Sequence, residues 1–554
     1  MSGSNHRPDR SGKDLIRNPG THVREESDRV AVSENRPNQA EARAGEAAEG
    51  GERRTRAKEN TGQASTVSTQ SGRAVSPGLE RVRKKAKEDK GARFTALLHH
   101  VTVELLEASF RKLRKQAAPG VDGVTWQEYE QGLAERLVDL HSRVHRGAYR
   151  AQPSLRVYIP KPDGRQRPLG IAALEDKIVQ QAVVEILNAI YENDFIGFSY
   201  GFRPGRSAHD ALDALSVALQ FEKVGWVLDC DIRSFFDRMS HEWTMEFVQR
   251  RIGDPRLLRL IQKWLKAGVS EEGQWSETTV GTPQGAVISP LLANIYLHYV
   301  LDEWAQAWRQ QAGGEMFVIR YADDAVFCFQ YRADAERFRQ ELEERLAAHG
   351  LELNAEKTRL IEFGRFAESN RRDRGQGPPE TFDFLGFTHI CGRDREGKFQ
   401  VKRRTIGKRM RATLLRIKQE LRRRMHDPVV RVGAWLKQVV EGYYRYHCVP
   451  GNLARMARFR HRVELLWRRA LRNRGGKRKP SWRKLIPLFE RWLPYARVCQ
   501  ELCVSGHSVD RSPSLQPGMG ARGKGAALEP PCPAQQCRNL SASASLQRRH
   551  PLWP

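Results

Sequence analysis

The stretch that decides the fold is Ile319-Arg320-Tyr321-Ala322-Asp323-Asp324-Ala325-Val326-Phe327-Cys328-Phe329. Two adjacent carboxylates stand between segments rich in β-branched and aromatic residues, which favour strands. The pattern predicts a hairpin that carries Asp323 and Asp324 at its tip. Like charges beside apolar strands are costly unless a cation neutralises them. The tip is therefore a candidate metal site, and a solvent-exposed Asx turn is the alternative.

Length and charge set the class of protein. A chain of 554 residues is too long for one compact core, so we expect two or three domains. Lys and Arg number 94 against 66 Asp and Glu, giving a net charge of +28, which favours a polyanionic partner. The best apolar run, Ala286 to Leu301, is interrupted by Pro290, Asn294 and His298, so we expect no membrane span.

The ends and the cysteines point to the cytoplasm and to nucleic acid. The N-terminus lacks the apolar core of a secretory signal. The eight cysteines are mostly scattered singly, which is typical of a reducing compartment. We therefore expect a cytoplasmic protein associated with nucleic acid rather than with a membrane.

Composition divides the chain into four segments. Residues 1–92 form a polar, basic tail that is expected to be disordered, with a basic helix over Leu79–Lys90 when a partner is present. Residues 93–395 carry the chemical motifs. Residues 396–498 predict a helical domain, and the helix from Ile406 to Met425 has one apolar stripe and a dense basic face. Residues 499–554 form a low-complexity tail.

A second acidic strand lies upstream of the hairpin. Residues 226–237 place Asp229 and Asp231 two apart, so both side chains share one strand face, and a salt-bridged strand pair is the alternative. Distant strands can meet in one antiparallel sheet and bring Asp231, Asp323 and Asp324 together. Such a cluster suits Mg²⁺, and two such ions catalyse in-line phosphoryl transfer. Since adjacent side chains diverge, we expect Asp323 to be the shared ligand and Asp324 the supporting one.

Three further segments have the composition of ligand-binding loops. Residues 157–171 predict a hairpin with an Asp-Gly turn, flanked by Lys161 and Arg167, which suits a phosphate group or is an ordinary charged hairpin. Residues 199–207 mix aromatic residues with Arg, as in loops that stack bases and contact phosphates. Gln284 stands between Pro and Gly before an apolar helix, where its amide is free to bond a ligand.

The order of these motifs resembles the group II intron-encoded reverse transcriptase/maturases from about Phe94 to Tyr495. The motifs that carry the resemblance are Ile159–Gly164, Ser199–Arg203, Asp231–Asp237, Gly281–Gly285 and the Tyr321–Asp324 tetrapeptide. The resemblance implies an α+β right-hand polymerase. Its fingers and palm, with an antiparallel palm sheet, would be followed by an α-helical thumb/maturase domain.

The resemblance also implies roles for individual residues. Asp231, the Ile232 carbonyl and Asp323 would bind two Mg²⁺ ions, with Asp324 completing the catalytic acids. The residues implied to contact the incoming nucleotide are Lys161 and Arg167 at the triphosphate, Phe236 at the sugar, Gln284 in the pocket, and Lys357 as acid for the leaving group. The residues implied to contact primer or template are Arg203, Phe384, Leu385 and Gly386.

The implied function is an RNA-directed DNA polymerase that copies intron RNA and assists its splicing and mobility. Its partners would be intron RNA, a DNA primer or target, and deoxynucleoside triphosphates. An RNA-binding maturase without polymerase activity is one alternative, against which the intact acids, Gln284 and Phe236 argue. A reverse transcriptase of another lineage, of the retron or defence type, is the other, and the helical C-terminal region argues against it.

The residue after the acids departs from the family pattern, and the C-terminal cysteines bear on which kind of family member the chain resembles. Ala325 follows the acids where a bulky aromatic residue is usual, so looser packing is expected behind the hairpin. The C-terminal Cys499, Cys503, His507, Cys532 and Cys537 have irregular spacing in low-complexity sequence, which disfavours a zinc site. The resemblance is therefore to the kind that lacks an endonuclease domain.

Overall fold

The computed structural model describes residues 76–160, 166–271, 273–474 and 480–498. The tail predicted over 499–554, its cysteines and most of the tail predicted over 1–92 lie outside these residues. No helix within the described ranges is long and apolar enough to cross a membrane. The described chain is a mixed α/β structure with three sheets, in which almost all strand pairs are antiparallel.

A four-stranded antiparallel sheet, here called the central sheet, is buried on both faces. Its strands in spatial order are β6 (Met316–Tyr321), β7 (Asp324–Phe329), β3 (Trp226–Asp231) and β8 (Arg359–Glu362). Alternate residues enter different cores: Phe327 and Leu228 pack on one side, and Val326 and Val227 on the other. Burial of both faces explains the nearly continuous apolar runs of β6 and β7.

Helices cover one face of this sheet. The Phe338 ring of α12 (Arg332–Ala347) lies 4.7 Å from the Phe327 ring of β7. The rest of the layer is one long helical run, in which α10 (Ser289–Leu297) leads into the π-helix η2 (His298–Asp302), then α11 (Glu303–Trp308) and the 3₁₀ turn η3 (Arg309–Gln311).

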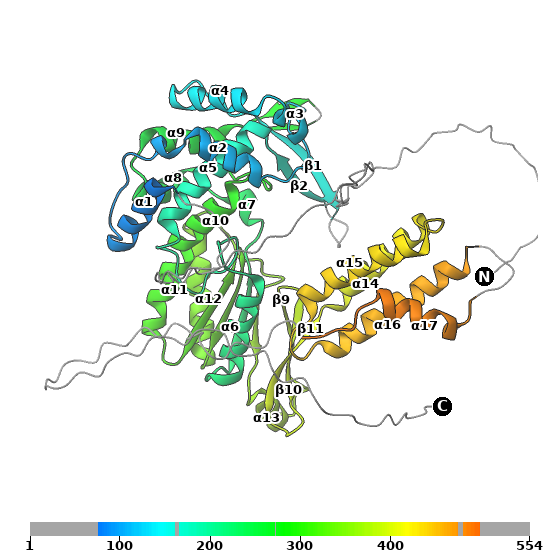
Figure 1. The fold of residues 1–554 in the computed structure, drawn as a ribbon. Helices are drawn as coiled ribbons and strands as arrows, with labels where there is room; N and C mark the ends of the chain where they lie inside the picture. The colour runs from blue at the N-terminus through cyan, green and yellow to red at the C-terminus, as the bar shows by residue number, and fades with distance from the viewer. Residues whose placement is uncertain (1–75, 161–165, 272, 475–479, 499–554) are drawn as a thin grey trace, which may run out of the picture. The chain divides into compact units, whose positions relative to one another are not determined.

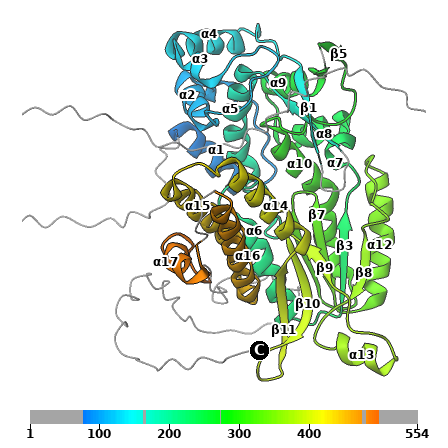
Figure 2. The same ribbon diagram turned by 90° about the vertical axis from the view of Figure 1, so that its right-hand side faces the viewer.

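The other face packs against α6 and a three-stranded sheet. Helix α6 (Ala208–Phe221) starts at a capping box in which Ser207 and Asp210 bond each other's backbone N–H groups. The second sheet has the order β11-β10-β9, and its strands are β9 (Phe382–Phe384), β10 (Phe387–Arg393) and β11 (Phe399–Thr405). Phe384 and Phe387 from this sheet share a core with Val326 of the central sheet. Figure 2 shows the central-sheet strands β7, β3 and β8 between α12 and the β9–β11 sheet.

The N-terminal part is a helical layer around a buried helix. Most residues of helix α5 (Leu174–Tyr191) are buried. Helices α1 (Pro77–Glu88) and α2 (Val103–Lys112) pack against it. The further helices of this region are η1 (Leu98–His100), α3 (Trp126–Glu130), α4 (Leu133–His145), α7 (Phe235–Arg238), α8 (His241–Arg251) and α9 (Pro255–Lys266). A further sheet has the order β2-β1-β4-β5, with strands β1 (Ser154–Pro160), β2 (Gln166–Ile171), β4 (Val269–Glu271) and β5 (Gln274–Ser276).

The predicted helical C-terminal region has its own core. Four helices pack together after the short helix α13 (Ala367–Asp373) and the second sheet (Figure 1). They are α14 (Gly407–Arg423), α15 (Val429–His447), α16 (Leu453–Arg472) and α17 (Trp482–Trp492). Their apolar stripes meet around Leu436, Phe459 and Trp467, all of which are fully buried.

The structure corrects the predicted boundary of the N-terminal tail. Helix α1 begins at Ser76, whose Oγ accepts a hydrogen bond from the N–H of Leu79 at 3.3 Å. Leu79, Val82 and Ala86 are buried in the main core. The Arg251 guanidinium then holds the following chain by donating to the Asp89 carbonyl at 3.2 Å and to the Ala92 carbonyl at 3.0 Å. Residues 76–92 therefore belong to the folded part.

Truncation tests this boundary. Removal of residues 1–75 is expected to leave the thermal unfolding temperature within about 1 °C of that of the full chain. Removal of residues 1–92 exposes the core beneath α1 and loses about 1.5–3 kcal/mol for each fully buried Leu or Val, so unfolding should occur several degrees lower. The measurement is circular-dichroism melting of both proteins. Equal unfolding temperatures would contradict the assignment of α1 to the core.

Candidate active site

The acidic hairpin forms as predicted. Strands β6 and β7 are joined by the two residues Ala322 and Asp323, and Asp324 is the first residue of β7. Ala322 has a φ of +58°, a region that non-glycine residues rarely occupy. Asp324 lies directly opposite Asp231 of β3, so these side chains share one face of the sheet. The sheet thus brings together acids that are nearly a hundred residues apart in sequence.

Burial, and after it repulsion among these carboxylates, raises the pKa values of Asp323 and Asp324. Surrounding protein, and then the charges of Asp323 and Asp231, raise the pKa of Asp324 to about 6, although its side chain remains open to solvent. The pKa of Asp323 is also raised, first by burial and then by Asp231. Directly opposed like charges destabilise a strand pair. The site therefore favours a bound cation.

Asp231 is held by a segment that docks along the end of β3. Its Oδ2 accepts hydrogen bonds from Lys357 Nζ at 2.8 Å and from Asn354 Nδ2 at 3.0 Å. The Asn354 N–H also donates to the Asp231 carbonyl at 2.8 Å. Ile232 lies opposite Leu353 in an antiparallel bridge. The hydrogen bonds of this bridge are made by the flanking residues, from Arg233 N–H to the Glu352 carbonyl and from Asn354 N–H to the Asp231 carbonyl. In such a pair the Ile232 carbonyl points away from the 352–354 segment. Lys357 is brought to the acids, as predicted, whereas Asn354 was not foreseen.

Phe236 and Gln284 lie on adjoining segments beside β3. Phe236 follows the strand on the short helix α7, and its carbonyl accepts from the Thr282 N–H at 2.8 Å. Gln284 Nε2 lies 3.4 Å from Asp237 Oδ1, and the Gln284 carbonyl accepts from the Gly170 N–H of β2 at 2.8 Å. Gly281 lies so close to this helix that an added Cβ would meet the Asp237 carbonyl at 2.8 Å. The structure therefore brings the two predicted nucleotide contacts together.

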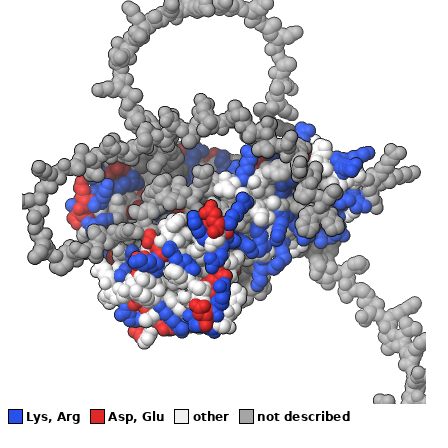
Figure 3. Space-filling view, turned by 90° about the horizontal axis from the view of Figure 1, so that it is seen from below, with Lys and Arg blue, Asp and Glu red and all other residues white. Residues whose placement is uncertain are grey.

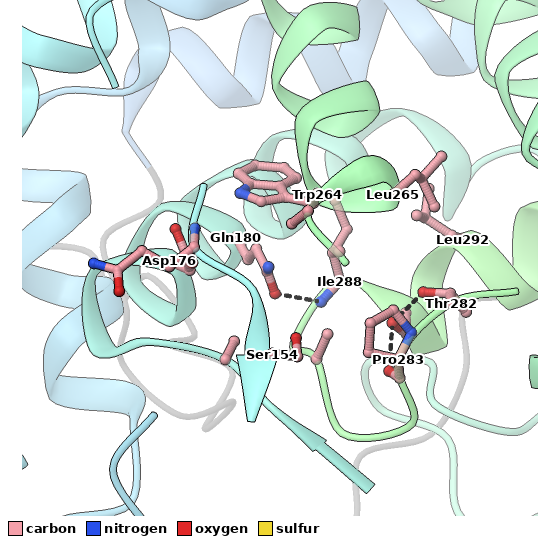
Figure 4. Close-up of a pocket in the computed structure, with 14 residues that line it drawn as sticks. Ser154, Asp176, Gln180, Trp264, Leu265, Thr282, Pro283, Ile288 and Leu292 are labelled. Carbon is pink, nitrogen blue, oxygen red and sulfur yellow. Dashed lines mark hydrogen bonds between the residues drawn. The ribbon is translucent and has the colours of Figure 1, made fainter. Parts of the chain in front are cut away.

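A buried glutamine fixes the loop that carries Gln284. Gln180 Oε1 of α5 accepts from the backbone N–H of Val287 at 3.0 Å. It also accepts from the backbone N–H of Ile288 at 3.4 Å (Figure 4). The Thr282 and Ser289 hydroxyls lie 2.6 Å apart and close the same turn. The adjoining cavity holds only about 10 Å³, which is room for one water molecule at most. It is thus part of the scaffold rather than a substrate site.

The hairpin over 157–171 is present, but part of its tip is not described. Lys161 lies outside the described residues. Arg167 is exposed on β2, and its positive charge acts to lower the pKa of Asp323. Of the two predicted phosphate contacts, Arg167 therefore lies close enough to Asp323 to act on its charge.

The predicted primer contacts form a second tight turn. Leu385 and Gly386 join β9 to β10 with φ values of +45° and +87°, as a type I′ hairpin requires. Tyr446 of α15 donates to the Leu385 carbonyl at 2.7 Å. Phe384 is only 4% exposed, so its ring belongs to the core and only the turn faces outward. Arg409 of α14, which was not foreseen as a site residue, lies against Gly386, and its charge partly opposes the rise in the pKa of Asp324.

The structure contradicts the expectation that Arg203 contacts primer or template. Its side chain is 3% exposed and paired with Glu192 at 3.1 Å. It also donates to the carbonyls of Ile196 at 2.9 Å and Ser199 at 2.8 Å. A guanidinium committed to these acceptors has no face left for a phosphate. From the same loop, Phe202 is 55% exposed, and its ring centroid lies 6.5 Å from that of Tyr321.

The three acids supply the ligand type that a hard divalent cation prefers, but their side chains are not turned toward one common point. Within the described ranges, no three His, Cys, Asp or Glu side chains are gathered into a ready metal site. The reason is visible at Asp231, whose Oδ2 is turned toward Lys357 and Asn354. The donors are nevertheless carboxylate oxygens that repel one another, which is the ligand type that Mg²⁺ prefers.

Comparison with known proteins places this site in a family. The model of the reverse transcriptase (RNA-dependent DNA polymerase) family matches residues 159–389. The chain is 36% identical over 353 residues to protein YkfC of Escherichia coli, covering 57% of this chain and 88% of that protein. It is also 36% identical over 222 residues to the group II intron-encoded protein LtrA of Lactococcus lactis, covering 40% of this chain and 37% of LtrA.

A more distant relative is the Arabidopsis thaliana protein nuclear intron maturase 2, mitochondrial, which is 27% identical over 172 residues, or 24% of this chain and 23% of that protein. The family match identifies a reverse transcriptase, an RNA-directed DNA polymerase of the kind that uses divalent metal ions. The chain belongs to the group II intron-encoded reverse transcriptase/maturase family. It spans well under half of LtrA itself.

Charge repulsion at the acids predicts a stability effect. Because the folded pKa of Asp324 is raised from 3.8 to about 6, its ionisation destabilises the metal-free fold above pH 6, and this penalty fades as the pH falls toward 4. Asp324→Asn should therefore raise the unfolding temperature at pH 8 by about 1–2 °C, with a smaller gain at pH 4.5. The measurement is calorimetry in EDTA. A less stable variant at pH 8 would show that the opposed charges are not the constraint.

Proposed function

We propose that Asp231, Asp323 and Asp324 are the catalytic acids of this polymerase and that they hold two Mg²⁺ ions during nucleotidyl transfer. The observation that carries the proposal is the direct opposition of Asp231 and Asp324 across β3 and β7, with Asp323 in the adjoining turn. The Ile232 carbonyl, which points away from the 352–354 segment, is a further candidate ligand. A carboxylate cluster that is costly without a cation suits this use.

The reaction joins a primer 3′-hydroxyl oxygen to the α-phosphorus of a deoxynucleoside triphosphate and releases pyrophosphate. When bound, the two metal ions favour loss of the hydroxyl proton and neutralise charge on the leaving oxygen. Lys357 Nζ, placed 2.8 Å from Asp231, is the candidate donor of a proton to the pyrophosphate. Arg167 is the candidate contact for the triphosphate, joined by Lys161, which lies outside the described residues.

Sugar and base selection are assigned to the segments beside β3. The half-buried Phe236 ring is the candidate surface against which a deoxyribose packs, so that a 2′-hydroxyl is excluded. The Gln284 amide, on a loop fixed by Gln180, is the candidate hydrogen-bonding group of the pocket. The Leu385–Gly386 turn, with Arg409 beside it, is the candidate contact for the primer end.

With these assignments, the sheets and helices correspond to the fingers, palm and thumb of a right-hand polymerase. The β2-β1-β4-β5 sheet with the N-terminal helices takes the role of the fingers. The central sheet and the β9–β11 sheet form the palm. Helices α14–α17 take the role of thumb and maturase domain. The support for the last assignment is that α14 leads directly from the sheet that carries the primer turn.

The C-terminal helices are the proposed binding surface for intron RNA. Figure 3 shows Lys and Arg crowded on the side of this face where these helices lie, with few acidic side chains between them. On α14 and α16, the exposed basic side chains include Lys408, Arg409, Arg411, Arg416, Arg422, Arg423, Arg458, Arg462, Arg469 and Arg472. Phosphate contacts from such a surface supply affinity with little sequence dependence. The relatives named for introns and maturases point to intron RNA as the partner.

A maturase without polymerase activity is the competing function, and Asp323→Asn separates the two. We expect the variant to lose cDNA synthesis by a factor of at least about 10³, because a catalytic acid is neutralised. Intron RNA affinity should stay within about twofold of wild type, since it depends on the basic surface. Primer extension on an RNA template and filter binding measure the two quantities.

The matched control is Asp139→Asn, which removes one exposed carboxylate from α4, far along the chain from the acids. It should leave both quantities unchanged. Loss of RNA binding together with synthesis in Asp323→Asn would contradict the separation of the two sites. Absence of any cDNA from the wild-type protein, with splicing still promoted, would leave the maturase function standing and remove the polymerase one.

Charge removal on α16 tests the RNA surface. The double variant Arg458→Gln/Arg462→Gln should weaken RNA binding and reduce the slope of log affinity against log salt by about 1.5–2, or 0.7–0.9 for each lost phosphate contact. The matched control, Arg332→Gln/Arg339→Gln, removes the same charge from α12 and should leave the slope unchanged. Equal slopes for the two double variants would show that α16 is not the contact surface.

A further inference from the structure

Arg320, which directly precedes the acidic hairpin turn, is a fully buried charge with every donor satisfied. Its Nε and Nη2 donate to Oδ1 and Oδ2 of Asp302 at 2.7 and 2.5 Å. Nη2 also donates to Ser199 Oγ at 2.7 Å, and Nη1 donates to Asn294 Oδ1 at 3.1 Å. The fifth bond runs from Nη1 to the carbonyl of Ala322, at 2.9 Å. All five N–H groups of the guanidinium are thus used.

Two partners of Arg320, Asn294 and Asp302, come from the helical run that covers one face of the central sheet. Asn294 belongs to α10, and Asp302 ends the π-helix η2 that interrupts the run. Both are buried, with exposures of 1% and 0%. A π-helical turn rotates the residues after it relative to a continuous α-helix, and such turns are frequent at functional sites. Here the π-helix ends with the carboxylate that pairs with Arg320.

This network reaches both sides of the strained residue of the turn. Arg320 bonds the carbonyl of Ala322, whose φ is +58°. On the other side, Gly201 lies so close that an added Cβ would clash with the Ala322 backbone nitrogen. The Gly201 carbonyl in turn accepts from Asn294 Nδ2 at 2.8 Å. Asn294 therefore ties Arg320 and the Gly201 loop into one unit around Ala322.

The same geometry gives a reason for the small residue at 325. Ala325 lies directly opposite Arg320 on β6 and opposite Cys230 on β3, so the three side chains share the sheet face that turns toward α10 and η2. Asp231 and Asp324, one residue further along their strands, lie on the opposite face. The buried charge pair thus supports the turn from behind while the acids project in front.

We propose that Arg320, with Asp302 and Asn294, is a positioning unit that holds the Ala322–Asp323 turn and thereby sets the spacing of Asp323 and Asp324 against Asp231. The inference deepens the proposed function and rests on those acids binding metal. If Arg320 served only the stability of the fold, its ion pair with Asp302 would be enough. Arg320 also bonds the Ala322 carbonyl and, through Asn294, reaches the Gly201 carbonyl. These bonds fix the backbone of the turn that carries the acids.

Arg320→Lys separates positioning from pairing. Lysine keeps the charge opposite Asp302, but its single ammonium cannot also span Asn294, Ser199 and the Ala322 carbonyl. The matched control is Arg251→Lys, in another buried ion pair, with Asp194 at 2.9 Å, which makes no contact with the turn. Both proteins are first compared with wild type by thermal unfolding, so that activity is read only from folded protein.

Two readouts follow, and the first needs no enzyme activity. The dissociation constant for Mn²⁺, measured by electron paramagnetic resonance, should rise at least fivefold in Arg320→Lys and stay within about twofold in Arg251→Lys. In single-nucleotide extension, kcat should fall by about ten- to a hundredfold, because a displacement of about 1 Å in a catalytic group has effects of that size. The KM for the nucleotide and the affinity for RNA should change less than about twofold.

Asn294→Leu provides a second variant that leaves the Arg320–Asp302 pair intact. It should shift Mn²⁺ affinity and kcat in the same direction as Arg320→Lys. Wild-type Mn²⁺ affinity in both Arg320→Lys and Asn294→Leu, or a loss that Arg251→Lys matches at equal stability, would overturn the positioning role. If the wild-type protein binds Mn²⁺ but makes no cDNA, the proposed function fails while the positioning inference is still tested by the metal affinities.

Discussion

The main constraint on this fold is that it holds two like charges, Asp231 and Asp324, directly opposite each other on neighbouring strands. Asp231 and Asp324 face each other where β3 and β7 reach the open end of the central sheet. Neighbouring side chains offset part of that repulsion. Lys357 and Asn354 donate hydrogen bonds to Asp231, and the charge of Arg409 favours the ionised form of Asp324. Such an arrangement persists only where the surrounding fold determines it. The same repulsion is the physical ground for the proposal that these acids bind a cation.

The rest of the fold serves as a rigid support for this strand end. The central sheet is buried on both faces, so its register cannot slip by one residue without turning every core side chain to the wrong side. That rigidity fixes Asp231 against Asp324 more firmly than loops would. The turn between β6 and β7 has no such support in the sheet, and the buried Arg320–Asp302 pair lies where that support is needed.

Local pattern predicted the elements well, and long-range packing was harder to foresee. The hairpin, the acids on β3 and the helix predicted from Ile406 to Met425, observed as α14, follow from periodicity and turn chemistry in short windows. The docking of α1 could not be predicted, because it depends on Arg251, far along the chain. Arg203 was misjudged for a related reason, since only the folded loop shows its guanidinium enclosed by Glu192 and two carbonyls. A signal for Arg320 was present, because a charge inside an apolar strand requires a buried partner.

The central claim is that the end of the β3–β7 strand pair is a two-metal polymerase centre. The most direct test is anomalous diffraction from crystals of the protein with an RNA template, a DNA primer, a non-reactive nucleotide and Mn²⁺. A two-metal centre should give two Mn²⁺ peaks about 3.5–4 Å apart, within coordination distance of Asp231 and Asp323. A ternary complex without Mn²⁺ at these acids, or with the ions bound elsewhere, would contradict it.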